Sequence, residues 1–269
     1  MDNYDDFTIH LPSNTRFIEA NTASKYVVKL ALSPNLSGEW ECGLKEIHYP
    51  HTWHNITDFY DKQFLRIGLV IKEARTTVYE DVYLQGGYYK NNSDLVKEIQ
   101  KKIRGVIYQD PELEASIKVS YNEFSRKINF EIPHRLEIVI NPQLAAVLGF
   151  DNQPKTWISL RKKHEKPKFP MAINLVDALY VYSDVVQTSL VGDAMVPLLR
   201  IVPVVGEYGK MSHIEYIKPV YYPLAKLNFS TVEIFITDSA GPKIDFPYGK
   251  TTIMLHFRRR KKRTNSGKL

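Results

Sequence analysis

Short segments that alternate apolar and polar residues fill most of this chain and constrain its fold more than any other feature. Many are rich in β-branched and aromatic residues, and Pro, Asn, Ser or Gly bound them, which is typical of half-buried β-strands. Strands are predicted in two sets, at 7–11, 25–32, 39–47, 64–71 and 77–84, and at 172–182, 197–202, 213–217, 231–237 and 251–257. Because such strands pack sheet against sheet, the sequence predicts a mainly antiparallel all-β fold.

The middle of the chain has a different pattern. A helix is expected where apolar residues at helical spacing follow a cluster of N-cap residues, namely Asn91–Asp94 before Leu95, Ile99, Ile103 and Val106. Strands are expected next at 116–121 and 127–132. A short helix follows, with Asn141 as its cap, Pro142 at its first position and Gly149 just past its end.

This change of pattern predicts how the chain is divided. The expected parts are a first group of strands (1–87), an inserted α+β domain (88–155), a charged connector (156–170), a second group of strands (171–257) and a disordered basic tail (258–269). The connector includes Arg161–Lys168, which we expect to be a solvated loop, with contact to an acidic partner surface as the alternative.

Charge is distributed very unevenly along the sequence. The chain holds 36 Lys and Arg residues against 30 Asp and Glu, and residues 258–269 hold seven of these cations and no acid. The remainder therefore carries 29 cations against 30 acids, which excludes the broad positive surface of a groove-reading nucleic-acid domain.

The basic segment itself allows three uses that do not exclude one another. They are a solvated terminus, a nuclear-import signal and non-specific contact with nucleic acid. The predicted nucleic-acid contacts are Arg258, Arg259, Arg260, Lys261, Lys262 and Arg263.

Motifs for catalysis and cofactor binding are not found in the sequence. It has no glycine-rich phosphate loop, no zincin helix and no Gly-x-Ser-x-Gly elbow, so neither an enzyme nor a cofactor is predicted. The single cysteine, Cys42, cannot form an intramolecular disulfide and is expected to be buried. Scattered acids could still pair as a glycosidase dyad, the alternative that the sequence leaves open; they include Asp177, Asp184, Asp193 and Glu207.

Three histidines recur at intervals of three residues, at His48, His51 and His54. Pro50 prevents a helix there, and residues three apart in an extended segment point to opposite faces. We therefore expect a structural corner anchored by Trp53, and no metal site. No stretch approaches the ~20 apolar residues of a membrane span, and residues 1–6 are acidic, which predicts neither a membrane span nor a secretory signal.

Several stretches in order along the chain carry a resemblance to a known family. They are 11–14, 38–44, 47–53, 144–150, 179–184, 192–193, 198–200, 246–250 and 255–259. Together they resemble the minor capsid, or penton, protein of Polinton/Maverick elements and their adintovirus relatives. The resemblance spans nearly the whole chain, and no catalytic residue can be carried over from it.

The resemblance implies a structural capsid protein with a single jelly-roll β-sandwich and an inserted domain. It further implies a homopentamer at the fivefold vertices of an icosahedral shell, surrounded by a double jelly-roll major capsid protein. The protein would then reside in the virion after assembly inside the host cell, for which the nucleus is one candidate compartment, with the basic tail facing packaged DNA. A ring of identical subunits needs two different patches per subunit, and aromatic clusters are candidates, namely Tyr88, Tyr89, Tyr180, Tyr182, Tyr221 and Tyr222.

Ordinary sheet packing is the alternative role of each of these tyrosines. Two other functions also stay open: a lectin-like or receptor-binding β-sandwich, and a nuclear DNA-associated protein that uses the basic tail.

Overall fold

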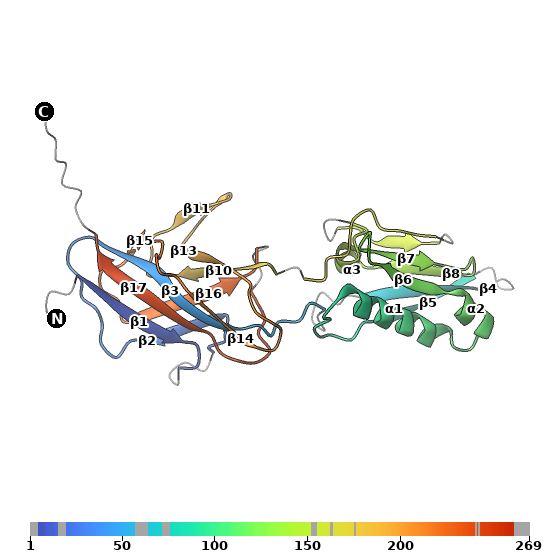
Figure 1. Cartoon of the computed structure of the whole chain (residues 1–269), viewed down its shortest axis with the longest axis horizontal. Coiled ribbons are helices and arrows are strands. Elements are labelled where there is room, and N and C mark those ends of the chain that lie inside the picture. The colour runs from blue at the N-terminus through green and yellow to red at the C-terminus, as the bar shows by residue number, and fades with distance from the viewer. Residues whose placement is uncertain are drawn as a thin grey trace, which may run out of the picture. The chain divides into compact units, whose positions relative to one another are not determined.

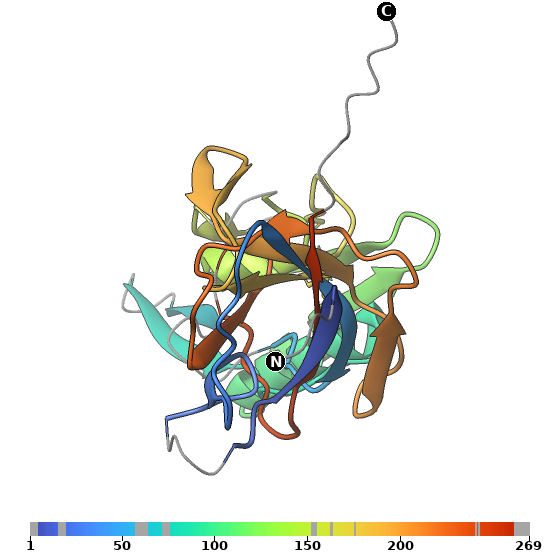
Figure 2. The same cartoon turned by 90° about the vertical axis from the view of Figure 1, so that its left-hand side faces the viewer.

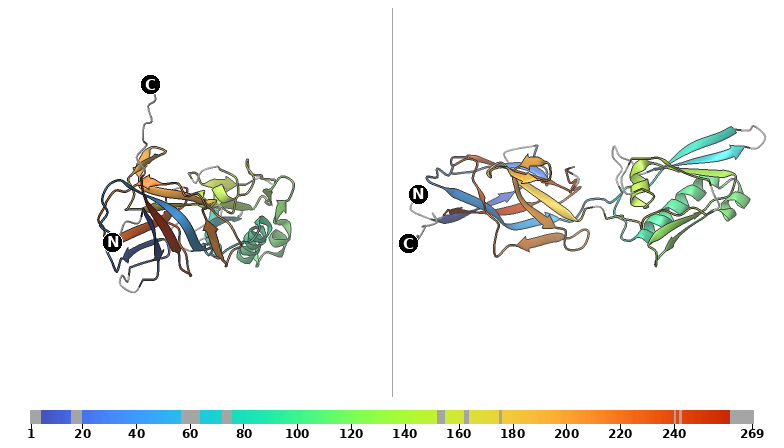
Figure 3. Two further views of the ribbon diagram at one scale, coloured as in Figure 1. Left: turned by 60° about the vertical axis from the view of Figure 1, so that its left-hand side comes forward. Right: turned by 90° about the horizontal axis from the view of Figure 1, so that it is seen from above.

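The computed structural model describes residues 5–15, 20–56, 64–71, 76–151, 155–161, 164–174, 176–239, 241 and 243–260 (Figure 1). The chain forms two compact units, of which the first joins Met1–Trp53 to Val176–Leu269 and the second comprises His54–Leu175. We call the first the jelly-roll unit and the second the inserted unit. Each has its own hydrophobic core, and the elements of each can be followed separately in Figure 3.

Two antiparallel sheets, each with four main strands, form the jelly-roll unit. One sheet has the order β1 (Asp6–Pro12), β17 (Thr252–Arg259), β3 (Trp40–Pro50) and β14 (Met211–Glu215). The other has the order β13 (Leu198–Pro203), β10 (Ala178–Ser183), β16 (Thr231–Thr237) and β2 (Lys25–Lys29). Figure 2 looks toward this unit and shows its strands arranged around a common interior.

The order of these strands identifies the topology. When only the eight strands of these two sheets are numbered in chain order, the first sheet has the order 1, 8, 3, 6 and the second has the order 5, 4, 7, 2. This is an eight-stranded, two-sheet jelly roll, which confirms the predicted fold class. The additional short strand β15 (Tyr222–Pro223) pairs with β3, and β11 (Ser189–Val191) forms a hairpin with β12 (Ala194–Val196).

The alternating pattern of β17 explains how the jelly-roll core forms. Ile253, Leu255 and Phe257 are fully buried, whereas the residues between them lie on the outer face of the sheet. Each buried side chain of this size contributes roughly 1.5–3 kcal/mol by leaving water. Tyr26 of β2 is also buried, and its hydroxyl donates a hydrogen bond to the Leu11 carbonyl oxygen at 3.1 Å, so its polar atom is satisfied.

The inserted unit is an α+β structure between the third and fourth strands of the jelly roll. Its main sheet has the order β5 (Thr76–Tyr83), β4 (Phe64–Ile71), β8 (Leu136–Ile140) and β9 (Ile158–Leu160). The remaining elements are the hairpin β6 (Lys118–Asn122) and β7 (Lys127–Glu131) and the helices α1 (Asn92–Ile107), α2 (Pro111–Ser116) and α3 (Pro142–Val147). Leu65 and Ile138 of the sheet share one core with Ile99 of α1 and Phe130 of β7.

Capping of the two predicted helices follows the sequence signals. Asn91 accepts a hydrogen bond from the Asp94 amide at 2.9 Å, and Asn141 accepts one from the Leu144 amide at 3.1 Å. Gly149 ends α3 with a φ of +82°. The amide of Phe150 donates to the Ala145 carbonyl at 2.9 Å and that of Gly149 to the Ala146 carbonyl at 3.1 Å, which is a Schellman motif.

The predicted boundaries of the inserted domain, 88 and 155, are wrong. Strands β4 and β5, assigned from the sequence to the jelly roll, pair with each other, and β4 also pairs with β8 of the inserted unit. Residues 156–170 are also more than a charged connector, because β9 pairs with β8 and Glu165 exchanges backbone hydrogen bonds with Phe130. In the segment expected to be a solvated loop, Arg161–Lys168, the side chains of Arg161, His164, Lys166 and Lys168 are exposed. Alternation identifies a strand but does not tell which sheet it joins, since pairing depends on distant partners.

Candidate functional surfaces

The start of the predicted basic tail is part of the folded structure. Arg258 and Arg259 are the last residues of β17, so the prediction of disorder from residue 258 is wrong for these two. The Arg258 Nε lies 2.5 Å from Glu41 Oε1, and its guanidinium lies 3.5 Å above the Tyr221 ring. These contacts direct Arg258 across the outer face of the sheet.

The next two arginines also have partners within the jelly-roll unit. The Arg259 amide donates to the Asp5 carbonyl at 2.8 Å, and its guanidinium lies 5.7 Å from the centre of the Trp40 ring. Arg260 lies 3.9 Å from a carboxylate oxygen of Glu39. Lys261, Lys262 and Arg263, the rest of the predicted nucleic-acid contacts, lie outside the described residues.

A surface hollow of about 780 Å³ surrounds this end of β17. Acids and bases both line it, namely Asp5, Asp6, Glu39, His256, Arg258, Arg259 and Arg260. Burial lowers the pKa of His256 and outweighs the opposing effect of Asp6, so the imidazole is held neutral. Local acids therefore offset much of the positive charge where the basic segment begins.

The six tyrosines proposed as interface residues are divided between the two units. Tyr88 and Tyr89 belong to the inserted unit, and Tyr89 packs against its core while its hydroxyl donates to the Gln85 carbonyl at 2.9 Å. Tyr180 and Tyr182 are half-buried on the outer face of β10. The side chains of Tyr88, Tyr89, Tyr180 and Tyr182 are therefore all partly exposed.

The remaining two tyrosines lie near the C-terminal end of β17. The Tyr221 hydroxyl and His256 Nδ1 share a hydrogen bond at 2.8 Å, and Arg258 covers the ring. Tyr222 packs against the jelly-roll core and pairs with Cys42 of β3. Tyr221 and Tyr222 therefore have clear packing roles within their own unit.

Larger exposed apolar side chains lie elsewhere on the jelly-roll unit. Leu190 and Met195 face each other across the β11–β12 hairpin and are 73% and 61% exposed. In the segment between β14 and β15, Ile217 is 90% exposed and Val220 is 48% exposed. Sequence analysis missed the hairpin, although Gly192 between two short apolar segments is a hairpin signal.

The inserted unit exposes a second kind of surface, on the open face of its four-stranded sheet. The Phe64 ring lies 5.3 Å from that of Tyr83 and 5.4 Å from that of Trp157. Beside them, Arg66 makes a paired contact with Asp81, with Nε 2.7 Å from Oδ1. Aromatic and arginine side chains are the types enriched at protein interfaces.

A buried carboxylate lies on this same face of the sheet. Glu137 accepts hydrogen bonds from Ser159 at 2.6 Å and Tyr79 at 2.9 Å, and Arg161 lies 2.8 Å away. Burial raises the pKa of Glu137, but these donors outweigh it and hold the pKa below its ordinary value. With three donors around it, this carboxylate fixes strands to one another and is not placed as a general acid.

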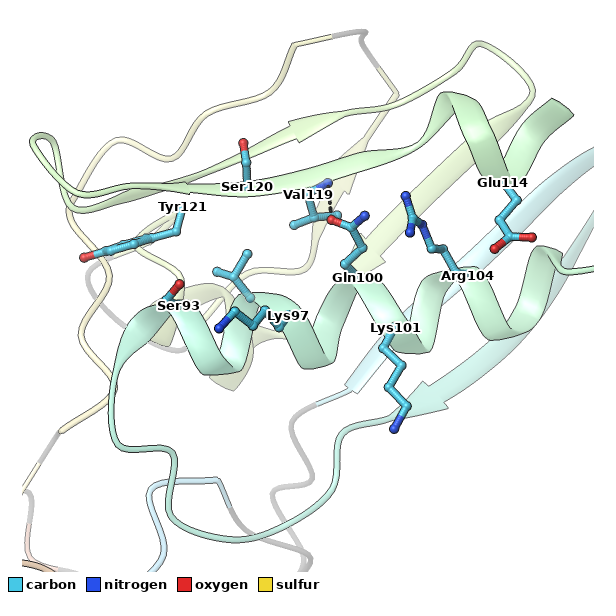
Figure 4. Close-up of a pocket in the computed structure, with 10 residues that line it drawn as sticks. Ser93, Lys97, Gln100, Lys101, Arg104, Glu114, Val119, Ser120 and Tyr121 are labelled. Atoms are coloured by element: carbon cyan, nitrogen blue, oxygen red, sulfur yellow. Dashed lines mark hydrogen bonds between the residues drawn. The ribbon is translucent and has the colours of Figure 1, made fainter. Parts of the chain in front are cut away.

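Cationic residues of α1 line a shallow groove of about 650 Å³ between this helix and β6 (Figure 4). Arg104 and Gln100 reach toward β6, while Lys101 points away from it. The Gln100 side chain accepts a hydrogen bond from the Val119 amide at 3.2 Å, which joins the helix to the strand. Because the cations diverge, they do not form a cradle for one anion.

The three histidines at intervals of three separate as the extended backbone requires. His51 is buried, and its ring stacks on Trp53 with centroids 4.3 Å apart, as expected for a corner anchored by Trp53. Burial lowers the pKa of His51 more than a hydrogen bond with the Gly206 backbone raises it. His48 lies on the outer face of β3, where it stacks on His213 of β14.

Two of the four acids considered for a glycosidase dyad, Asp184 and Glu207, make structural contacts. Asp184 accepts a hydrogen bond from the Glu233 amide at 2.8 Å and lies 3.3 Å from Lys226 Nζ. Glu207 pairs with Lys210 at 2.8 Å on the surface. Asp177 and Asp193 lie on different segments, before β10 and in the β11–β12 turn.

No protein-family model matches this sequence, and no curated protein matches it. Among solved structures, the chain is similar to the selenomethionine-labelled mavirus penton protein, with 12% sequence identity and a TM-score of 0.48. The alignment covers 95% of this chain and 99% of that one. Within the described part of the chain, the helices are too short or too polar to cross a bilayer.

Proposed function

We propose that this chain is a structural subunit of an icosahedral capsid, with identical copies closed into rings of five at the vertices. The observation that carries the proposal is a complete jelly roll that exposes two different apolar patches, one on the β11–β12 hairpin and one between β14 and β15. The family resemblance of the sequence, which spans nearly the whole chain, supports the same role.

Ring closure explains why two patches are needed. In a ring, each subunit contacts its neighbour through two different surfaces, so a patch on one copy meets a different patch on the next. The hairpin patch is Leu190 and Met195, and the loop patch is Ile217 and Val220. We assign these as the two halves of one repeated contact between jelly-roll units.

The proposed partners follow from this role. The ring would lie among copies of a double jelly-roll major capsid protein in the virion, and the inserted unit would be free to present its aromatic sheet face. Assembly would take place inside the host cell. The function proposed is structural, with no catalytic step.

We also propose that the cations beyond Arg260 face packaged DNA. Since Arg258 and Arg260 already pair with Glu41 and Glu39, fewer than six cations are available for phosphates. For about four phosphate contacts, the log–log salt slope of DNA binding is expected at about −3 to −4. Deleting residues 261–269 should abolish DNA retention at low salt and leave the thermal unfolding profile unchanged, whereas loss of folding would contradict this role.

The ring contact is tested with charge substitutions and light scattering. Leu190→Asp should shift a pentameric mass to that of the monomer, because it places a carboxylate in a desolvated contact. Phe124→Asp is the matched control, since Phe124 is fully exposed at the turn of the β6–β7 hairpin in the inserted unit. If Leu190→Asp leaves the pentamer intact, the hairpin is not the contact; if carbohydrate binding by a monomer is found, the lectin-like alternative is favoured.

A further inference from the structure

Two histidines and one glutamate meet on the outer face of the first jelly-roll sheet. His48 of β3 pairs directly with His213 of β14, and Glu46 lies two residues before His48 on the same face. The imidazole rings stack with centroids 4.2 Å apart and an interplanar angle of 14°. Sequence analysis could not have found this group, because His213 is brought to β3 only by strand pairing.

The ligand atoms of these three residues converge. Glu46 Oε2 lies 3.8 Å from His48 Nε2 and 3.9 Å from His213 Nε2, and the three ligand atoms lie within 4.8 Å of one another. Among the described residues, the ion-pair partners of Glu46 are these two histidines, so no lysine or arginine occupies its carboxylate there. Glu215 lies opposite Glu46 in the register and adds negative charge on the same side.

We propose that Glu46, His48 and His213 bind one zinc ion or a similar divalent transition metal. Two imidazoles and one carboxylate form a donor set that zinc accepts, with water completing a tetrahedron. Zinc bonds of about 2.0–2.2 Å place tetrahedral ligand atoms roughly 3.4 Å apart, so the three ligand atoms must approach one another by about 1 Å. The two imidazole rings must also rotate out of their stack, because a metal ion lies near the plane of each imidazole that binds it. All three residues lie on paired strands, so their backbones are held in place and only the side chains need to adjust to bind the metal.

The position of the site suggests what the metal does. Strand β14 is the edge strand of its sheet. Among the described strands it pairs with β3 alone, so its backbone forms sheet hydrogen bonds on one side. A metal held by residues of both strands would tie the edge strand to the sheet. It would also stabilise the jelly-roll unit, because the site exists only when the two strands are paired.

Zinc titration of the metal-free full-length chain tests this proposal. We expect one zinc ion per chain, measured by competition with a chromophoric chelator and by elemental analysis after dialysis. His48→Gln and His213→Gln should each weaken binding at least about tenfold. His164→Gln is the control, because His164 is exposed in the inserted unit and should leave binding unchanged.

Two further measurements keep the test independent of how the variants fold. Cobalt bound to the wild-type protein should give the intense visible absorption of a tetrahedral site, and Glu46→Gln should weaken it. Zinc at about one hundred times its dissociation constant should raise the melting temperature of the jelly-roll unit by roughly 5–10 °C. No zinc binding, or equal binding by wild type, His48→Gln and His213→Gln, would overturn the proposal whatever the oligomeric state of the chain.

Discussion

The jelly-roll unit and the inserted unit are held together in different ways. The jelly-roll core consists of inward-facing residues from strands far apart in sequence, such as Leu11 and Leu255. The inserted unit combines a sheet with capped helices, and its core includes several turns of α1. Local sequence signals therefore account for more of the inserted unit, and pairing between distant strands for more of the jelly-roll unit.

The stabilities of the two units are also expected to respond differently to low pH. In the jelly-roll unit, the buried His51 and the half-buried His256 both have lowered pKa values. The inserted unit instead contains the buried carboxylate of Glu137, with a lowered pKa. Each unit should therefore lose stability in its own range of pH.

Substitution of Gly149 should produce the largest difference between the stabilities of the two units. Gly149→Ala forces a side chain into a left-handed conformation, and its Cβ would lie 2.3 Å from the Phe169 carbonyl oxygen. We expect the inserted unit to lose roughly 2–4 kcal/mol of unfolding free energy while the jelly-roll unit is unaffected. Differential scanning calorimetry would measure this as a downward shift of one transition only.

Gly105 provides the control for this substitution. It lies within α1, and a Cβ there would meet no atom within 4 Å. Gly105→Ala should therefore stabilise the inserted unit by about 0.5–1 kcal/mol. Equal destabilisation of both units by Gly149→Ala would contradict their independence.

These glycines also show what the sequence could predict. Asn91, Asn141 and Gly149 signal helix ends through neighbours within a few residues, and the predictions of α1 and α3 are confirmed. The two-sheet jelly roll was predicted through the resemblance, and its strand segments were found from alternation. In contrast, the predicted domain boundary is wrong because β4 and β5 look like jelly-roll strands until the pairing of β4 with β8 is known.

The candidate surfaces were harder to predict for the same reason. Arg258 was assigned to a tail because its partners, Glu41 and Tyr221, are distant in sequence. The Glu46, His48 and His213 group likewise depends on the β3–β14 register. Exposure of Leu190 and Ile217 could not be deduced from residue type, since apolar residues are normally expected inside.

A smaller effect should follow from changing the buried carboxylate of the inserted unit. Glu137→Gln removes the charge that holds Ser159, Tyr79 and Arg161, and should cost roughly 1.5–3 kcal/mol. Since the folded pKa of Glu137 lies below its unfolded value, its stabilisation is present above the unfolded pKa and is lost as pH falls through the folded pKa. The variant should lose this part of the acid sensitivity below about pH 4.5.

Calorimetry of the inserted unit between pH 7 and pH 3 checks this prediction. Glu131→Gln is a suitable control, because Glu131 forms only a partly exposed pair with Lys118 at 3.8 Å. It should change stability by less than about 0.5 kcal/mol. If stability depends on pH in the same way in Glu137→Gln and wild type, this carboxylate does not hold the strands together.

The smallest effect is expected for the histidines of the jelly-roll unit. Burial lowers the folded pKa of His51, so the unfolded chain binds protons first as pH falls below about 6.5. The jelly-roll transition should lose stability between pH 7.5 and 5.5, while the inserted-unit transition stays constant. His51→Gln should reduce this loss, and a simultaneous decline of both units would contradict the assignment.

Native mass spectrometry of the full-length protein across a range of concentrations tests whether copies of this chain close into rings of five. The chain has a mass of 31.2 kDa, and we predict a dominant species at five times this value that does not grow further with concentration. A chain that remains monomeric or dimeric at every concentration and salt, alone and mixed with its shell partner, would contradict the account.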